Sequence, residues 1–240
     1  WGDFVFITIK LKDIITPATV LVMIAAFVLT AVFVLPQKSV DAVSTYRTGT
    51  LVIDAGHGGV DGGAVSAAGN KESDINLSIA LKMDSLCDFL GINHVLTRES
   101  DVPTSTENYS EHDNLVARAE MANSIENAVL ISIHQNKFPS DKVRGAEVMY
   151  SNSEQSKALG LAAQSNLVSA VDPENRRVAR PAPSELLLTA TAKCPAILAE
   201  CGFMSNAEEA QLLSTDAYQI KIAAALVSAY IIYLDDQSVT

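Results

Sequence analysis

The sequence contains little cysteine, and no two of its cysteines have the spacing of a metal or redox motif. Cys87, Cys194 and Cys201 are too few and too scattered for a disulfide framework. No C-x-x-C pair is present, which argues against a zinc ribbon and against a thioredoxin-like redox site. The spacing permits a bridge between Cys194 and Cys201, but nothing in the sequence supports one.

Basic residues are also scarce. The chain of 240 residues has 17 Lys and Arg against 28 Asp and Glu, which gives a net charge of −11. Broad nucleic-acid binding normally needs a basic face, so this balance argues against a nucleic-acid partner. Only 8 prolines and 12 glycines accompany 48% hydrophobic residues, which excludes a disordered or collagen-like chain. The length fits one folded domain with an accessory segment.

Charged residues are missing altogether from residues 14–36, a run of 23 residues rich in Val, Leu, Ala, Ile and Phe. A helix of this length can cross about 30 Å of hydrocarbon, whereas a buried core helix would normally show a polar stripe. We therefore expect a transmembrane helix at residues 14–36. Residues 37–49 are expected to form a short polar tether.

The charges beside this helix leave its orientation open, because two lysines precede it and Lys38 and Arg47 follow it. A signal peptide cleaved near Ala42 or Ser44 is the alternative. Its apolar region would exceed the usual length of about 7 to 15 residues. We therefore expect an uncleaved anchor.

After the tether, short apolar runs alternate with segments of helical periodicity. This alternation predicts a single α/β domain with a mostly parallel or mixed twisted sheet covered by helices. Apolar residues spaced three and four apart between Ile75 and Leu90 predict one helix, which Gly91 is well placed to end. The expected strands are residues 51–54, 92–98, 129–134, 145–150 and 196–200.

Two further helices are expected near the end of the chain. Ser205, followed three residues later by Glu208, has the pattern of a capping box for a short helix. The last helix, about residues 218–234, has a charge-free run of only 13 residues. That run is too short to span a membrane, so this helix is expected to pack in the core.

Three of the expected strands end in, or just before, an ionisable residue: His57, His134 and Glu200. In open α/β sheets ligands bind at the carboxyl ends of strands, so these side chains are expected to converge. Glu72 lies at the beginning of the helix after a glycine-rich loop, where it can turn back toward them. Two imidazoles with a carboxylate form a zinc-hydrolase ligand set, and a second carboxylate can serve as proton shuttle.

These residues also have simpler structural interpretations. Glu72 alone fits a carboxylate that complements a helix N-terminus, His134 a hydrogen-bonded structural histidine, and Glu200 half of a buried salt bridge. The glycines around His57 suggest a phosphate loop, but Asp61 breaks the dinucleotide fingerprint and no Walker A sequence is present. A nucleotide-binding membrane protein is therefore disfavoured.

The sequence around these residues contains several recognisable motifs. They are Val52–Gly59 (VIDAGHGG), Glu72 with Asp74, Leu96–Asp101 (LTRESD), Ser132–Asn136 (SIHQN), Gly145 with Ala146, and Glu200–Asn206 (ECGFMSN). Together they resemble the zinc-dependent N-acetylmuramoyl-L-alanine amidases, in order from about residue 51 to residue 233. The resemblance implies that His57, Glu72 and His134 are zinc ligands and that Glu200 is the catalytic carboxylate. Single-anchor members that act on spore cortex look most similar.

The resemblance also implies a function and a location. The function is Zn²⁺-dependent hydrolysis of the amide bond between N-acetylmuramic acid and L-alanine in peptidoglycan, in spore cortex or in cell-wall remodelling. Because that substrate lies outside the cytoplasmic membrane, we expect a single-pass membrane protein with an extracytoplasmic catalytic domain. The expected organisation is a short cytoplasmic segment at residues 1–13, the anchor at 14–36, the tether at 37–49 and the amidase domain at 50–236.

The expected partners are peptidoglycan and the membrane, without nucleic acid, and the sequence identifies no activator protein. The alternative function is a non-catalytic peptidoglycan-binding or regulatory protein on the same fold, which the loss of a ligand would indicate. No ligand is lost. Arg176, Arg177 and Arg180 offer positive charge to stem-peptide carboxylates. A basic cluster is more often a solvated face, so these arginines stay outside the predicted site.

Overall fold

The computed structural model describes residues 49–104 and 110–237. The predicted cytoplasmic segment at residues 1–13, the anchor at 14–36 and all but the last residue of the tether lie outside the described residues. Residues 50–236, the predicted amidase domain, lie within the described residues apart from residues 105–109.

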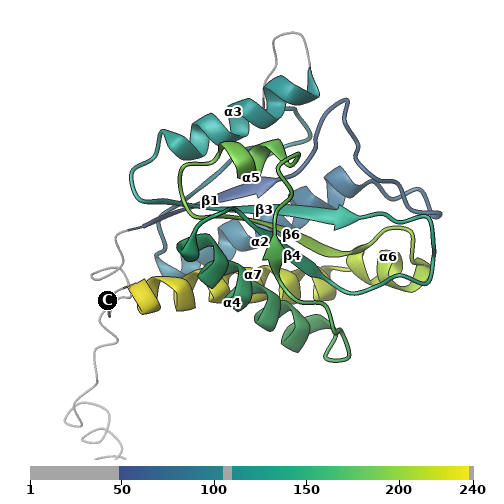
Figure 1. Cartoon of the computed structure of the whole chain (residues 1–240). Coiled ribbons are helices and arrows are strands. Elements are labelled where there is room, and N and C mark those ends of the chain that lie inside the picture. Colours follow the sequence, from purple (N-terminus) through teal and green to yellow (C-terminus); the bar gives the residue numbers. More distant parts are fainter. Residues whose placement is uncertain (1–48, 105–109, 238–240) are drawn as a thin grey trace, which may run out of the picture. The chain divides into compact units, whose positions relative to one another are not determined.

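A six-stranded mixed sheet forms the centre of the domain, in the order β2-β1-β3-β6-β4-β5 (Figure 1). Four strands are parallel, and β4 runs antiparallel to β6 with β5 parallel to β4. This arrangement confirms the predicted mixed α/β sheet. The strands are β1 (Thr50–Ala55), β2 (His94–Leu96), β3 (Ala128–Asn136), β4 (Glu147–Tyr150), β5 (Arg180–Pro181) and β6 (Ala196–Phe203).

Helices cover both faces of the sheet (Figure 1). On one face lie α2 (Glu72–Leu90), α4 (Glu154–Val171) and α7 (Asp216–Gln237), and α2 and α4 each pack against α7. On the other face lie α3 (Glu111–Asn123) and the short α5 (Leu187–Thr191). The remaining helix, α6 (Ala207–Leu213), connects β6 to α7.

The helix predicted from apolar spacing is confirmed as α2. Its stripe of Ile75, Ile79, Met83 and Cys87 is buried in the main core. Gly91 adopts a left-handed conformation with φ of 65°, and its N–H donates to the carbonyl of Asp88, which ends the helix. Glycine adopts this conformation without the steric cost that a Cβ would add.

The predicted capping box at Ser205 is wrong by one residue. The helix begins at Ala207, and Asn206 is its N-cap, because the Asn206 side chain accepts a hydrogen bond from the backbone N–H of Glu209 at 3.0 Å. The Ser205 hydroxyl instead accepts from the backbone N–H of Phe138. Ser205 and Asn206 are both residue types favoured at an N-cap. Asn206 caps the helix because the hydroxyl of Ser205 is bonded to the loop at Phe138.

The last helix, α7, is the one described helix long and apolar enough to cross a membrane. Its apolar side chains, including Ile222, Leu226 and Tyr230, are nevertheless buried in the core, and the helix packs against α2 and α4. The prediction that it is a core helix is confirmed. All three cysteines are free, so a Cys194–Cys201 bridge is absent from the described domain.

Candidate metal centre

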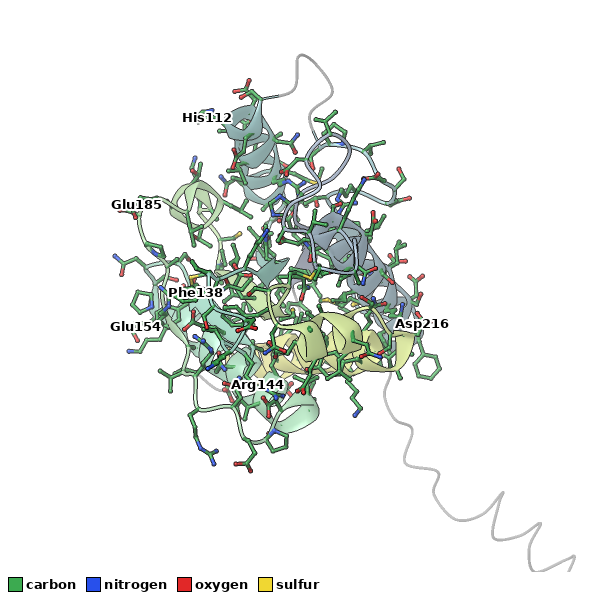
Figure 2. All side chains as sticks on the ribbon, turned by 90° about the vertical axis from the view of Figure 1, so that its right-hand side faces the viewer. His112, Phe138, Arg144, Glu154, Glu185 and Asp216 are labelled. Carbon is green, nitrogen blue, oxygen red and sulfur yellow. The ribbon has the colours of Figure 1, made fainter. Side chains whose placement is uncertain are left out.

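The carboxyl ends of β1, β3 and β6 meet at one edge of the sheet, which faces the viewer in Figure 2. Glu200 on β6 lies opposite His134 on β3, and the pairing shifts register between His134 and Asn136. His57 follows β1, the neighbour of β3 on its other side. A register shift beside a site re-aims the side chains that follow it. The predicted convergence of the three strand ends is therefore observed.

His57, Glu72 and His134 form a compact cluster. One ligand atom from each lies within 4.8 Å of the other two. Glu72 Oε1 is 3.2 Å from His57 Nε2 and 3.1 Å from His134 Nδ1. The two imidazole rings are 4.9 Å apart between centroids and nearly perpendicular. Two imidazole nitrogens and one carboxylate oxygen at this separation can hold a single metal ion.

Backbone amides from two loops hold the Glu72 carboxylate in place. Oε2 accepts from the N–H of Ala64 at 2.8 Å, and Oε1 accepts from the N–H of Gln135 at 3.0 Å. Glu72 is the first residue of α2, as predicted. Its carboxylate faces the histidines, so complementing a helix N-terminus does not account for its position.

The loop after β1 fixes the His57 ring. Nδ1 of His57 lies 2.7 Å from Oδ2 of Asp61, which leaves Nε2 facing Glu72. His57 has a left-handed backbone conformation with φ of 62°. Arg118 stabilises this conformation, because its Nη2 donates to the His57 carbonyl at 2.6 Å. A non-glycine residue in this region persists only where its surroundings hold it.

Gly56 is required for the approach of the second histidine. A Cβ at this position would lie 2.4 Å from Cε1 and Nε2 of His134. No side chain fits at that distance, so only glycine allows β1 and the His134 ring to come this close. The glycine-rich sequence thus serves the imidazole cluster.

The charges within the cluster are strongly coupled. Burial alone would lower the pKa of His57, but its hydrogen bonds and charge interactions with Glu72 and Asp61 raise this pKa to about 9. Burial would raise the pKa of Glu72, but its hydrogen bonds to His134 and His57 hold it well below the ordinary range. The carboxylate is therefore ionised and surrounded by cationic or hydrogen-bonding groups, an environment that a metal dication would also satisfy.

Glu200 lies beside this cluster in a cavity of about 280 Å³. Burial raises its pKa to about 7, with the Glu72 charge adding to this and the nearby His134 opposing it. Its Oε2 is buried and has no hydrogen-bond partner among the described residues. No ion pair of Glu200 is found within residues 49–104 and 110–237, so a salt bridge does not explain its burial.

Two buried arginines support the loop, and no motif in the sequence indicates either role. Arg118 pairs with Asp54, a fully buried carboxylate whose pKa is lowered because the Arg118 charge and the hydroxyls of Ser132 and Thr97 outweigh the effect of burial. Arg98 donates to the carbonyls of Gly56 and Ser73 at 3.1 and 2.8 Å. These bonds tie the turn at Gly56 to the first turn of α2.

Comparison with known proteins identifies the family. The family described as N-acetylmuramoyl-L-alanine amidase matches residues 51–231. The chain belongs to this family. The resemblance drawn from the motifs is thereby confirmed, and the match spans β1 to most of α7.

Relatives of this amidase include the germination-specific N-acetylmuramoyl-L-alanine amidase of Bacillus subtilis, which is 32% identical over 78% of this chain and 80% of the relative. Among solved structures, the CwlD amidase of Clostridioides difficile, in complex with the GerS lipoprotein, has a TM-score of 0.73 and 36% identity. The alignment covers 78% of this chain and 99% of the CwlD chain. An N-acetylmuramoyl-L-alanine amidase from Clostridium difficile 630 has a TM-score of 0.70 and 32% identity, over 80% and 99% of the two chains.

Proposed function

We propose that this amidase hydrolyses the amide bond between N-acetylmuramic acid and L-alanine in peptidoglycan with a zinc ion held by His57, Glu72 and His134. The observation that supports this most is the meeting of three ligand atoms within 4.8 Å beside a buried carboxylate in a cavity. A non-catalytic peptidoglycan-binding protein on the same fold would not need this carboxylate.

The donor set fits zinc. Two imidazoles and one carboxylate are a ligand set of catalytic zinc sites, in which the remaining position stays open to substrate or water. When bound, the ion supplies Lewis-acid chemistry that polarises a carbonyl and makes water more acidic. Asp61 orients His57 for this task by accepting from its Nδ1, as outer partners of metal-binding histidines commonly do.

In this proposal Glu200 moves the proton. Its ionised carboxylate removes a proton from the attacking water and then delivers it to the departing nitrogen of L-alanine, so that the products are a free carboxylate on the muramic acid and a free amine on the peptide. A carboxyl group whose pKa lies near neutral pH suits both steps. The same cavity gives the substrate access to Glu200 and to both histidines.

The proposed location follows from the substrate. Peptidoglycan lies outside the cytoplasmic membrane, so the predicted anchor at residues 14–36 would hold the domain on the outer side, with residues 37–49 as tether and residues 1–13 inside the cell. The sequence relative from Bacillus subtilis is named germination-specific, which supports a role in spore cortex as the finer proposal. The relative solved with a lipoprotein supports a protein partner for this chain as well.

The test is zinc content and release of free stem peptide from purified peptidoglycan by the domain from residue 48 onward. The alignment with the solved amidase from Clostridium difficile 630 covers 99% of that chain and 80% of this one, which supports testing this region by itself. We expect about one zinc per chain. Glu200→Gln should retain the zinc and lose about two to four orders of magnitude in rate.

Wild-type turnover by Glu200→Gln would exclude its role in proton transfer, and full activity without metal would exclude the zinc site. Zinc binding with no release would point to a missing activator or a modified cortex substrate, and the absence of bound zinc would favour the non-catalytic alternative. Release only from cortex peptidoglycan would support the germination role.

A further inference from the structure

Glu147 lies directly beside Glu200 on the neighbouring strand. The two residues are paired across β4 and β6, and Val148 and Ala199 continue this antiparallel register. Residues directly opposite each other in a sheet share a face, so Glu147 and Glu200 project from the same side. Two carboxylates side by side would repel each other unless cations are nearby.

Two arginines supply those cations. Arg177 Nη1 lies 3.4 Å from Glu147 Oε1, and Arg180 Nη2 lies 3.2 Å from Glu147 Oε2. Arg180 is paired with Met149 on β4, and Met149 is paired with Leu198, which lines the cavity. Arg180 therefore lies on the cavity face of the sheet.

The Arg177 side chain is fixed. Its Nε donates to the carbonyl of Arg144 at 3.0 Å, and its guanidinium lies 4.8 Å from the centroid of the Phe203 ring. A guanidinium has five N–H donors, and one carboxylate cannot use those of two arginines. The cluster of Glu147, Arg177 and Arg180 thus has unused N–H donors and one positive charge beyond that paired with Glu147, which balances the ionised form of the neighbouring Glu200.

The opposite side of the site has the reverse character. Toward α3 and α5 the cavity is lined by leucines, among them Leu115 and Leu188, by the carboxylates of Glu111 and Glu185, and by Arg118, whose charge is paired with Asp54. Neither carboxylate has an ion-pair partner within the described residues. In Figure 2, Glu185 lies on one side of Phe138 and Arg144 lies on the other. The carbonyl of Arg144 accepts the hydrogen bond from Arg177.

We propose that Arg177 and Arg180 bind the free α-carboxylate of the second residue of the stem peptide, D-glutamate. In this orientation the peptide extends from the scissile bond across β4 and β5. The uncharged glycan lies toward α3 and α5. This inference rests on the proposed function, since it assumes that a stem peptide enters the site. Guanidinium groups bind carboxylates through paired N–H donors, and the acidic side would repel the same group.

The distances agree with this assignment. Neighbouring strands lie about 4.8 Å apart, so β5, two strands from β6, is about 10 Å from the strand that carries Glu200. An extended chain advances about 3.4 Å per residue, so the second residue and its carboxylate reach toward this position. The first residue, L-alanine, has only a methyl side chain and no charge to offer.

Binding of a small peptide to the zinc-loaded domain, measured by calorimetry, tests the proposal without turnover. The probe is L-alanyl-γ-D-glutamate with its γ-carboxyl blocked as an amide and its α-carboxylate free, and the comparison is the same peptide with both carboxyls amidated. Arg180→Gln and Arg177→Gln should weaken binding of the free-carboxylate peptide about tenfold or more and leave the amidated peptide unchanged.

Glu147→Gln should act in the opposite direction and tighten the free-carboxylate complex, because it removes the competing carboxylate. A merely structural cluster would instead lose affinity in all three variants and for both peptides. Arg176→Gln is the matched control, because Arg176 pairs with Glu174 on the surface and not with Glu147. It should bind both peptides as the wild type does.

Equal wild-type affinity for the free and amidated peptides would overturn the proposal. So would unchanged affinity in Arg180→Gln, the more exposed of the two arginines. These outcomes are independent of whether the domain cleaves peptidoglycan, so failure of this inference and failure of the proposed function are distinguishable.

Discussion

Asp61 and His57 are joined by a hydrogen bond of 2.7 Å between Oδ2 and Nδ1, four residues apart in one loop. The same aspartate accepts from the N–H of Gly63 through its other oxygen, at 3.0 Å. One carboxylate therefore fixes both the backbone of the loop and the tautomer of a proposed metal ligand. A measurement of metal affinity tests the second of these roles, the orientation of His57.

Replacing Asp61 should weaken zinc binding without abolishing the fold. We expect Asp61→Ala to reduce zinc affinity about 10- to 100-fold, because His57 loses the acceptor that orients its ring. Competition with a chromogenic chelator measures this. Asp101→Ala is the matched control, since Asp101 accepts from the N–H of Gly59 in the same loop and contacts no imidazole. Similar losses in both variants would mean that loop order, and not the His57 contact, determines affinity.

Gly56→Ala should disrupt the cluster by steric overlap. The new Cβ would lie 2.4 Å from the His134 ring, so either the ring or β1 must move. We expect zinc affinity to fall at least tenfold and the free energy of unfolding to fall by about 1 to 3 kcal/mol.

Gly62→Ala provides the comparison in the same loop. There the nearest neighbour of a new Cβ is the flexible Lys71 side chain at 3.4 Å, an ordinary contact. Zinc affinity should remain that of the wild type. A Gly56→Ala domain with unchanged zinc affinity would show that His134 is not held where the structure has it.

Glu200 should lower the stability of the metal-free domain at alkaline pH. Its pKa rises from 4.5 in the unfolded chain to about 7 in the fold, so its full contribution is present below pH 4.5 and is lost as pH rises through 7. Glu200→Gln removes this dependence. At pH 8 the metal-free variant should be more stable than the wild type by about 3 kcal/mol, and at pH 4.5 the two should be nearly equal.

Urea unfolding of both metal-free proteins at the two pH values measures the difference. A constant difference across this range would contradict the raised pKa. With metal bound, the nearby dication favours the ionised carboxylate, so the acid limb of the activity profile should have its midpoint below 7.

Three residues of the proposed site, His57, His134 and Glu200, were predictable because their strands are apolar and end in or just before polar residues, and Glu72 was predictable from its place at the start of the helix after the glycine-rich loop. β1, β3 and β6 have this pattern, and parallel strands bring their ends to the same edge. Neither strand order nor the antiparallel direction of β4 can be read from such a pattern. The proximity of Glu147 to Glu200 was consequently missed.

The helix α3 was missed for a different reason. The buried residues of α3 are Asn114, Arg118, Ala119 and Ala122, so no apolar stripe marks its inner face. Arg118 is buried because Asp54, 64 residues earlier in the chain, provides its counter-charge. A pairing over this distance becomes visible only in the folded sheet. β5 was missed because it has two residues, both exposed.

Strand β6 is the last strand of the chain to be synthesised, yet it lies between β3 and β4. A nascent chain that ends before β6 already contains His57, Glu72 and His134, but it cannot join β4 to the rest of the sheet. The proposed proton-transfer residue thus arrives with the strand that closes the sheet. A polypeptide that ends before β6 would lack the proposed proton-transfer residue, so it should not hydrolyse the substrate even if it had already bound its metal.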